Sequence, residues 1–326
     1  MLKVINGIIA VVAGVGGALV LYWGLNALVE RLPERSEERI KPYVFIGPAL
    51  VMVTIFLVYP AVRTIYLAFF DASSENFVGF TNFVELARDR DIRVMIVNTL
   101  LWIIFVPAIS VSIGLAVAVL ADKLRARGEK LTKSIIFLPM AISFVGASTI
   151  WRFVYDASKP AGTDQIGLLN GIWTAFGNDP VGWLQVRTGS FNDFLLMIIM
   201  VWLQAGFAMV LLSAAIKNVP DETIEAARID GATERQIFWR VTVPQIWATL
   251  TVVFTTIVIG VLKAFDIVYV MTGGNFETDV IANRFFTELF SFRQNGRAAA
   301  IVVVLIVAVI PVMILNIRRF RAEEAR

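Results

Sequence analysis

Long apolar runs separated by short polar segments dominate the hydrophobic pattern of this chain. The runs are long enough to cross a hydrocarbon core of about 30 Å, which takes roughly 20 residues of helix. Strands of a membrane barrel would alternate apolar and polar residues in short segments, and these runs do not. The pattern predicts an all-α membrane protein with seven spans, at residues 5–29, 43–70, 94–121, 134–155, 192–216, 246–270 and 298–317.

Composition agrees with this prediction and narrows the possible chemistry. Hydrophobic residues make up 58% of the chain and charged residues only 17%, whereas charged residues make up about 25% of a typical soluble domain. The chain has no cysteine and no histidine, so thiol chemistry and the commonest neutral-pH acid–base group are absent. The net charge of +3 is small and its basic residues lie in loops, which argues against a nucleic-acid partner.

The distribution of Lys and Arg between the spans predicts the orientation of the chain. Segments 31–42 and 318–326 each carry four basic residues and segment 122–133 carries five, whereas 156–191 carries only Lys159 and Arg187. The positive-inside rule places the basic segments in the cytoplasm. The N-terminus is then outside, the C-terminus is inside, and 217–245 is cytoplasmic.

The sequence leaves open the roles of two segments, the first predicted span and the external segment 156–191. Residues 5–29 are long and lack a small-residue cleavage pattern, which favours a retained helix over a signal peptide. Gly14, Gly16 and Gly17 fit close helix packing, but a lipid-facing anchor is equally compatible with them. In the external segment 156–191, Trp173, Phe176 and Trp183 suit an interfacial aromatic belt or a surface that binds an external partner.

A polar segment, "KNVPDETIEAARIDGATERQIFWRVTVP", interrupts the apolar pattern between the fifth and sixth spans. Pro220, followed by two acidic residues, begins a helix that Gly231 is placed to end. Thr233 and Gln236 form a capping box for a second helix. Alanines keep this helix pair thin, and a few apolar side chains could anchor it. It could fill a groove on another protein or lie on the lipid surface.

These residues resemble the EAA loop of the permeases of ATP-binding-cassette (ABC) importers. That pattern has EAA, a glycine four residues after the second alanine, and later a hydrophobic residue and a proline. The matching positions are Glu225, Ala226, Ala227, Asp230, Gly231, Ala232, Phe238 and Pro244. The carbohydrate-uptake permeases related to the maltose and glycerol-phosphate systems resemble this chain in four further segments, 48–71, 77–86, 98–102 and 265–274. Residues 1–42 are similar to α-glucoside permeases.

The resemblance implies a six-helix permease domain over 43–326, with its coupling loop at 217–245 and an additional N-terminal helix and linker over 1–42. "GGNFET" (273–278) departs from the family pattern, so no role is carried over to it. In the family, the glutamate of the EAA loop pairs with a basic residue of the ATPase and the glycine permits a bend, roles that fall here on Glu225 and Gly231.

The resemblance also implies partners. The chain has no phosphate-cradling G-x-x-x-x-G-K-[ST] loop, so ATP and Mg²⁺ would bind to a separate ATPase and no cofactor to this chain. The expected assembly contains a second permease, two ATPase copies and an extracytoplasmic sugar-binding protein in the cytoplasmic membrane. Transport would follow alternating access.

Polar and aromatic residues within the spans are candidates for the path of a sugar, because sugar sites combine a few polar groups with aromatic faces. They are Asn98, Trp151, Gln204, Phe265, Asp266 and Tyr269. Lys263 and Asp266, three residues apart, would share one face of a helix, and their pairing fits helix packing as well as a substrate path. An ion-coupled secondary transporter is the alternative function, but no internal repeat is visible. A membrane enzyme has few residues from which to build a site.

Overall fold

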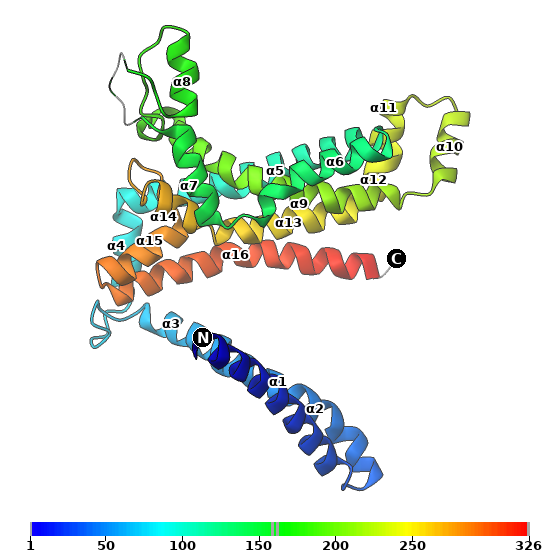
Figure 1. Ribbon diagram of the computed structural model, residues 1–326. Helices are drawn as coiled ribbons and strands as arrows, with labels where there is room; N and C mark the ends of the chain where they lie inside the picture. The colour runs from blue at the N-terminus through cyan, green and yellow to red at the C-terminus, as the bar shows by residue number, and fades with distance from the viewer. Residues whose placement is uncertain (1, 158–159, 161–162, 325–326) are drawn as a thin grey trace. The chain divides into compact units, whose positions relative to one another are not determined.

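The computed structural model describes residues 2–157, 160 and 163–324, and its regular structure is almost entirely helical (Figure 1). Within these ranges there is no strand, only an isolated bridge between Phe70 and Phe77. Four helices are long and apolar enough to cross a membrane, or up to six if each of two bent pairs is one span. The predicted all-α class is confirmed, and Lys159 lies outside the described residues.

The chain divides into two compact units, Met1–Tyr66 and Leu67–Arg326. The first contains α1 (Leu2–Val29), α2 (Glu34–Val53), a π-helical turn (Thr54–Val58) and nearly all of α3 (Tyr59–Leu67). Tyr22 of α1 stacks on Phe45 of α2, with 6.0 Å between ring centroids. A Cβ at Gly14, Gly16 or Gly17 would meet no described atom within 4 Å, so these glycines make no close helix contact within the described chain.

The second unit is organised around α5 (Arg90–Asp122) and α9 (Phe191–Lys217). Helix α5 begins where the Asp89 carboxylate accepts a hydrogen bond of 2.9 Å from the Asp91 N–H. The two helices approach closely at Gly114, where a Cβ would lie 2.6 Å from Cβ of Ala208. Small residues therefore allow the two backbones to meet, and large side chains such as Trp102, Leu196 and Met209 fill the core beside them.

The predicted span 134–155 is bent, and the predicted span 246–270 is bent relative to the segment that leads into it. Helix α6 (Ala126–Phe137) continues into a 3₁₀ turn (Leu138–Ala141) and meets α7 (Phe144–Tyr155) at 104°. The bend is stabilised by Ser143, whose hydroxyl accepts the Gly146 N–H at 3.1 Å and so caps α7. Helix α13 (Trp247–Leu262) meets the segment before it at 68°. Helix α14 (Asp266–Met271) follows α13 and packs on α7.

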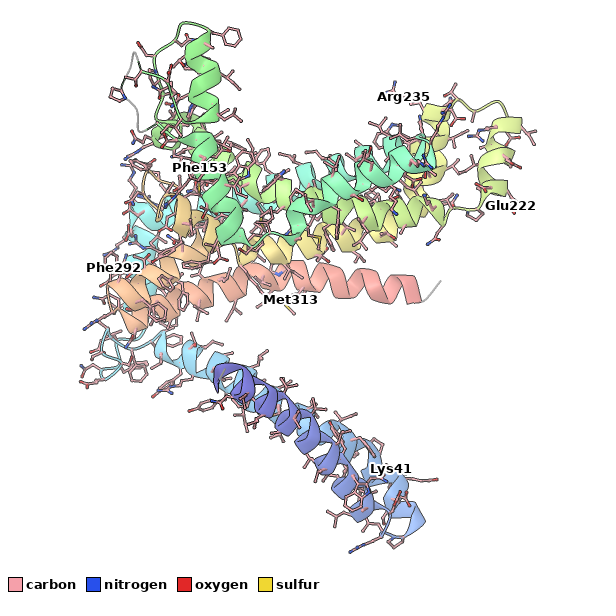
Figure 2. The ribbon with its side chains drawn as sticks, in the orientation of Figure 1. Lys41, Phe153, Glu222, Arg235, Phe292 and Met313 are labelled. Carbon is pink, nitrogen blue, oxygen red and sulfur yellow. The ribbon has the colours of Figure 1, made fainter. Side chains whose placement is uncertain are left out.

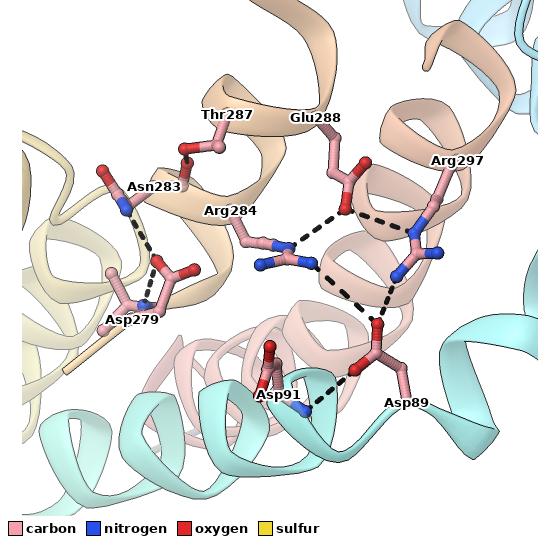
Figure 3. Close-up of polar contacts among 9 residues, drawn as sticks. Asp89, Asp91, Asp279, Asn283, Arg284, Thr287, Glu288 and Arg297 are labelled. Carbon is pink, nitrogen blue, oxygen red and sulfur yellow. Dashed lines mark hydrogen bonds and ion pairs between the residues drawn. The ribbon is translucent and has the colours of Figure 1, made fainter. Parts of the chain in front are cut away.

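A second core is formed by α4 (Thr81–Arg88), α15 (Ile281–Phe286) and α16 (Asn295–Glu324) with the start of α5. Figure 3 shows that Asp89 and Glu288 each face both Arg284 and Arg297. Glu288 is only 2% exposed and lies 3.0 Å from Arg284 Nε and 3.2 Å from Arg297 Nε. This ion cluster ties α5, the turn after α15 and α16 together.

Candidate functional site

The polar segment forms two short helices at one end of the long helices of the second unit (Figure 1), α10 (Asp221–Ile229) and α11 (Glu234–Ile237). Helix α10 ends in a Schellman motif, in which the Ala232 N–H donates to the Ala227 carbonyl and the Gly231 N–H to that of Arg228, each at 3.0 Å. Gly231 has a φ of +80°, which a residue with a Cβ adopts only at a cost. The predicted glycine stop is confirmed.

The second helix begins as the sequence predicts. The hydroxyl of Thr233 accepts from the Gln236 N–H, and the Gln236 side chain accepts from the Thr233 N–H at 2.8 Å. This is the reciprocal capping box. Arg228 also joins the two helices by donating to Glu234 at 2.8 Å, and this hydrogen bond raises the pKa of the Arg228 guanidinium.

Most side chains of α10 and α11 are exposed, and Glu222 and Arg235 project outward in Figure 2, whereas Ile237 is buried. Glu225, Ala226, Asp230 and Gly231 are exposed, whereas Ala227, Ala232 and Phe238 are half-buried. Ile229 is 87% exposed and Trp239 is 57% exposed. Exposed apolar side chains beside an accessible glutamate fit a groove on another protein as well as the lipid surface.

An ion cluster at the base of this segment was not predicted from the sequence. Lys217, three residues before Pro220, lies 2.5 Å from Glu129 of α6 and 3.5 Å from Asp122 of α5. Lys133 of α6 reaches the same Glu129 oxygen at 2.5 Å. The cluster ties the end of α9, just before α10, to α5 and α6.

A cavity of about 460 Å³, which we call the Gln204 cavity, lies at the bend before α7. Two of the predicted path residues, Gln204 of α9 and Asp266 of α14, line it together. Its other lining residues are Met140, Ile142, Ser143, Phe144, Val145 and Leu203. A carboxylate, an amide and a hydroxyl in a largely apolar pocket of this size can orient a small polar ligand.

The expected pairing of Lys263 with Asp266 on one helix is wrong. Helix α13 ends at Leu262 and α14 begins at Asp266, so the chain breaks between the two charges. Lys263 is exposed, and no ion pair joins it to Asp266 among the described residues. The break places Asp266 at the N-terminus of α14, where the helix dipole favours a negative charge.

The remaining path candidates are not among the residues that line the Gln204 cavity. Asn98 is 2% exposed and donates to the carbonyls of Glu277 and Asp279 at 2.6 and 3.0 Å, which anchors the loop after α14. Trp151 packs edge-on against Trp202, with centroids 5.8 Å apart. Phe265 stacks on Tyr269 at 4.9 Å.

A family model described as "Binding-protein-dependent transport system inner membrane component" matches residues 110–318. The chain belongs to this family. It is a transport subunit and a multi-pass membrane protein rather than an enzyme, and ATP hydrolysis lies on a separate partner. Nothing in the comparisons favours an ion-coupled transporter.

Two curated relatives match most of the chain. It is 56% identical over 280 residues to the osmoprotective compounds uptake permease GgtC of Synechocystis, covering 86% of this chain and 99% of GgtC. It is 43% identical over 338 aligned positions to the α-glucoside transport system permease AglF of Rhizobium meliloti, covering 99% of each.

A solved structure shares the fold. One chain of a bacterial ABC transporter involved in the import of the acidic polysaccharide alginate matches with a TM-score of 0.75 at 24% identity. The match covers 88% of this chain and 99% of that one. The predicted ABC-importer permease fold is therefore confirmed at the level of the overall helical arrangement.

Proposed function

We propose that this chain carries a glucoside, most simply an α-linked disaccharide or oligosaccharide, across the cytoplasmic membrane as one permease of an ABC importer. The full-length similarity to the α-glucoside permease AglF carries the proposal. The Gln204 cavity supports it, because it offers a carboxylate, an amide and a hydroxyl to a polyhydroxylated ligand. The greater identity to GgtC makes an osmoprotective compound the second candidate.

The proposed assembly contains a second, different permease, two ATPase subunits that bind ATP and Mg²⁺, and an extracytoplasmic sugar-binding protein. Residues 43–326 form the permease domain, and seven spans place the N-terminus outside and the C-terminus in the cytoplasm. Asn98, Trp151, Phe265 and Tyr269 remain candidates beside Gln204 and Asp266 for the sugar path. A solved alginate importer in complex with a periplasmic protein shares the fold.

In this mechanism α10 and α11 are the coupling helices. Exposed Glu225 would pair with a basic residue of the ATPase, and Ile229 would enter an apolar part of the same groove. ATPase closure would then push on α10, and the ion cluster around Glu129 would pass the movement to α5, α6 and α9. Rigid rocking of these helices opens the path alternately to each side.

Charge reversal at Glu225 tests the coupling role. Glu225→Lys and Gly231→Pro should each abolish sugar-stimulated ATP hydrolysis and uptake by the reconstituted complex, while this subunit still inserts in the membrane. Glu38→Lys, the same reversal at an exposed site in α2, should retain both. Normal stimulation and uptake in Glu225→Lys would show that α10 is not the coupling helix.

Uptake of radiolabelled maltose, trehalose and glycine betaine by the complex tests the substrate class. ATP-dependent uptake of maltose supports a glucoside, whereas uptake of trehalose, which is both an α-glucoside and an osmoprotective compound, fits both candidates. Uptake of glycine betaine alone, which has no hydroxyl groups, would favour the second candidate and exclude the first.

A further inference from the structure

A second cavity, of about 370 Å³, lies at the other end of α7. We call it the Trp183 cavity, and its lining includes Arg152, Asp156, Trp183, Gln185, Thr272 and Phe276. Helix α7 contributes to the Gln204 cavity through Phe144 and to the Trp183 cavity through Tyr155. The 12 residues of α7 span roughly 18 Å at about 1.5 Å per residue. Helix α14 also joins the two, through Asp266 and Met271.

The lining of the Trp183 cavity combines aromatic faces with planar polar groups. Trp183 and Phe276 supply the aromatic rings, and Arg152, Asp156 and Gln185 supply a guanidinium, a carboxylate and an amide. Such groups form paired hydrogen bonds with neighbouring hydroxyls, and aromatic rings cover apolar C–H faces. A sugar ring presents both kinds of surface.

The two aromatic residues are held in place by their own neighbours. Trp183 packs edge-on against Trp173, with ring centroids 5.9 Å apart, and at a tilt against Phe191, with centroids 6.4 Å apart. Its buried indole N–H has no acceptor among the described residues, so ring packing rather than a hydrogen bond positions it.

Phe276 is fixed in an unusual backbone conformation. Its φ is +59°, which is costly for a bulky residue. The Asn192 amide donates to its carbonyl at 2.8 Å, and the Arg187 guanidinium lies over its ring at 5.9 Å. The surrounding residues therefore hold the ring beside the cavity at the expense of backbone strain, as is common at ligand sites.

We propose that the Trp183 cavity is a sugar-binding subsite that holds one ring of the transported glucoside before it reaches the Gln204 cavity. The proposal rests on the proposed function. It assigns a role to Trp183, an aromatic residue of the predicted external segment that the coupling mechanism does not use. The sugar would then move along α7 and α14, because each of these helices lines both cavities.

Protection of an engineered cysteine tests this subsite, because the chain has no cysteine of its own. Gln185→Cys places a thiol in the cavity lining, and Thr188→Cys places one on the exposed surface three residues away. Each variant is assembled into the complete importer in lipid nanodiscs, without binding protein or ATP. Labelling of this subunit by a membrane-impermeant maleimide is followed by mass spectrometry with and without maltose or trehalose.

The disaccharide that the wild-type complex transports should slow labelling of Gln185→Cys, by roughly tenfold when its concentration is about ten times its dissociation constant. Labelling of Thr188→Cys should not change. Adding Trp183→Ala to Gln185→Cys should remove the protection, whereas Trp183→Phe, which keeps a ring, should retain most of it.

Equal labelling with and without sugar, or equal protection of both cysteines, would overturn the subsite. So would protection of Gln185→Cys by sugar-free binding protein but not by sugar, because the cavity would then be a contact for that protein. Absence of disaccharide uptake by the wild-type complex is a separate result. It contradicts the proposed substrate and is known before any labelling is done.

Discussion

Arg297 and Arg90 both form ion pairs near the start of α5, but they differ in burial. Arg297 pairs with Glu288, which is 2% exposed, whereas Arg90 is 76% exposed and pairs with Glu277 at 3.3 Å. Arg297→Ala leaves a buried carboxylate short of a partner and should destabilise the protein by about 3–5 kcal/mol. Arg90→Ala should cost at most about 1 kcal/mol. Thermal unfolding of the purified subunit measures both, and equal shifts would contradict this ranking.

The carboxyl of Asp279, in the loop after α14, predicts a pH dependence of stability. Burial raises its pKa from 3.8 to about 6, although the Asn283 amide and the Arg284 charge oppose the shift. When the pKa of an acid is higher in the folded state than in the unfolded state, the acid stabilises the fold at a pH below its unfolded pKa. This stabilisation is lost as the pH rises through the folded pKa. A difference of about two between the folded and unfolded pKa corresponds to a loss on the order of 3 kcal/mol in the free energy of unfolding.

Asp279→Asn keeps a side-chain oxygen that accepts the hydrogen bond from Asn283, but the amide cannot ionise. The variant should match the wild type near pH 4 and unfold at a higher temperature near pH 7. Burial alone would raise the pKa of Asp89, but the Asp91 N–H and the Arg297 guanidinium outweigh it and lower that pKa. The pKa of Asp89 therefore shifts in the opposite direction to that of Asp279. Parallel unfolding profiles of variant and wild type would show that Asp279 does not titrate as described.

Among the helices, the contact of α5 with α9 depends on the absence of a side chain at Gly114. An added Cβ would lie 2.7 Å from the Met209 backbone nitrogen, so one backbone has to move. Gly114→Ala should destabilise the subunit by about 1–3 kcal/mol. Gly17→Ala is the matched control, because no atom lies within 4 Å of its added Cβ. Thermal unfolding of the two variants compares them, and a Gly114→Ala variant as stable as Gly17→Ala would contradict the close approach.

Apolar runs predicted where helices occur, but not where they break. The run over 246–270 has a nearly uninterrupted apolar pattern, yet α13 ends at Leu262 and α14 begins at Asp266. The coupling segment was predicted in more detail, because Gly231, Thr233 and Gln236 act through local hydrogen bonds. Asn98 bonds instead to residues about 180 positions away, and sequence spacing does not reveal such a partner.

For the whole molecule, the described residues that line both cavities and form the coupling helices all belong to the second unit, Leu67–Arg326, whereas α1 belongs to the first. We therefore expect a chain without residues 1–30 to retain ATP-dependent sugar uptake close to that of the full chain. The shortened chain keeps the basic residues of 31–42. These residues should keep this segment in the cytoplasm and so preserve the orientation of the span that follows it.

The experiment compares uptake by complexes that contain the full or the shortened chain at equal amounts in the membrane. A single cysteine introduced at Glu38, probed with an impermeant maleimide from each side, checks that the orientation is unchanged. The shortened chain carrying Gly231→Pro is the inactive control. Loss of uptake in a shortened chain that is correctly oriented and bound to its ATPase would show that α1 takes part in transport itself.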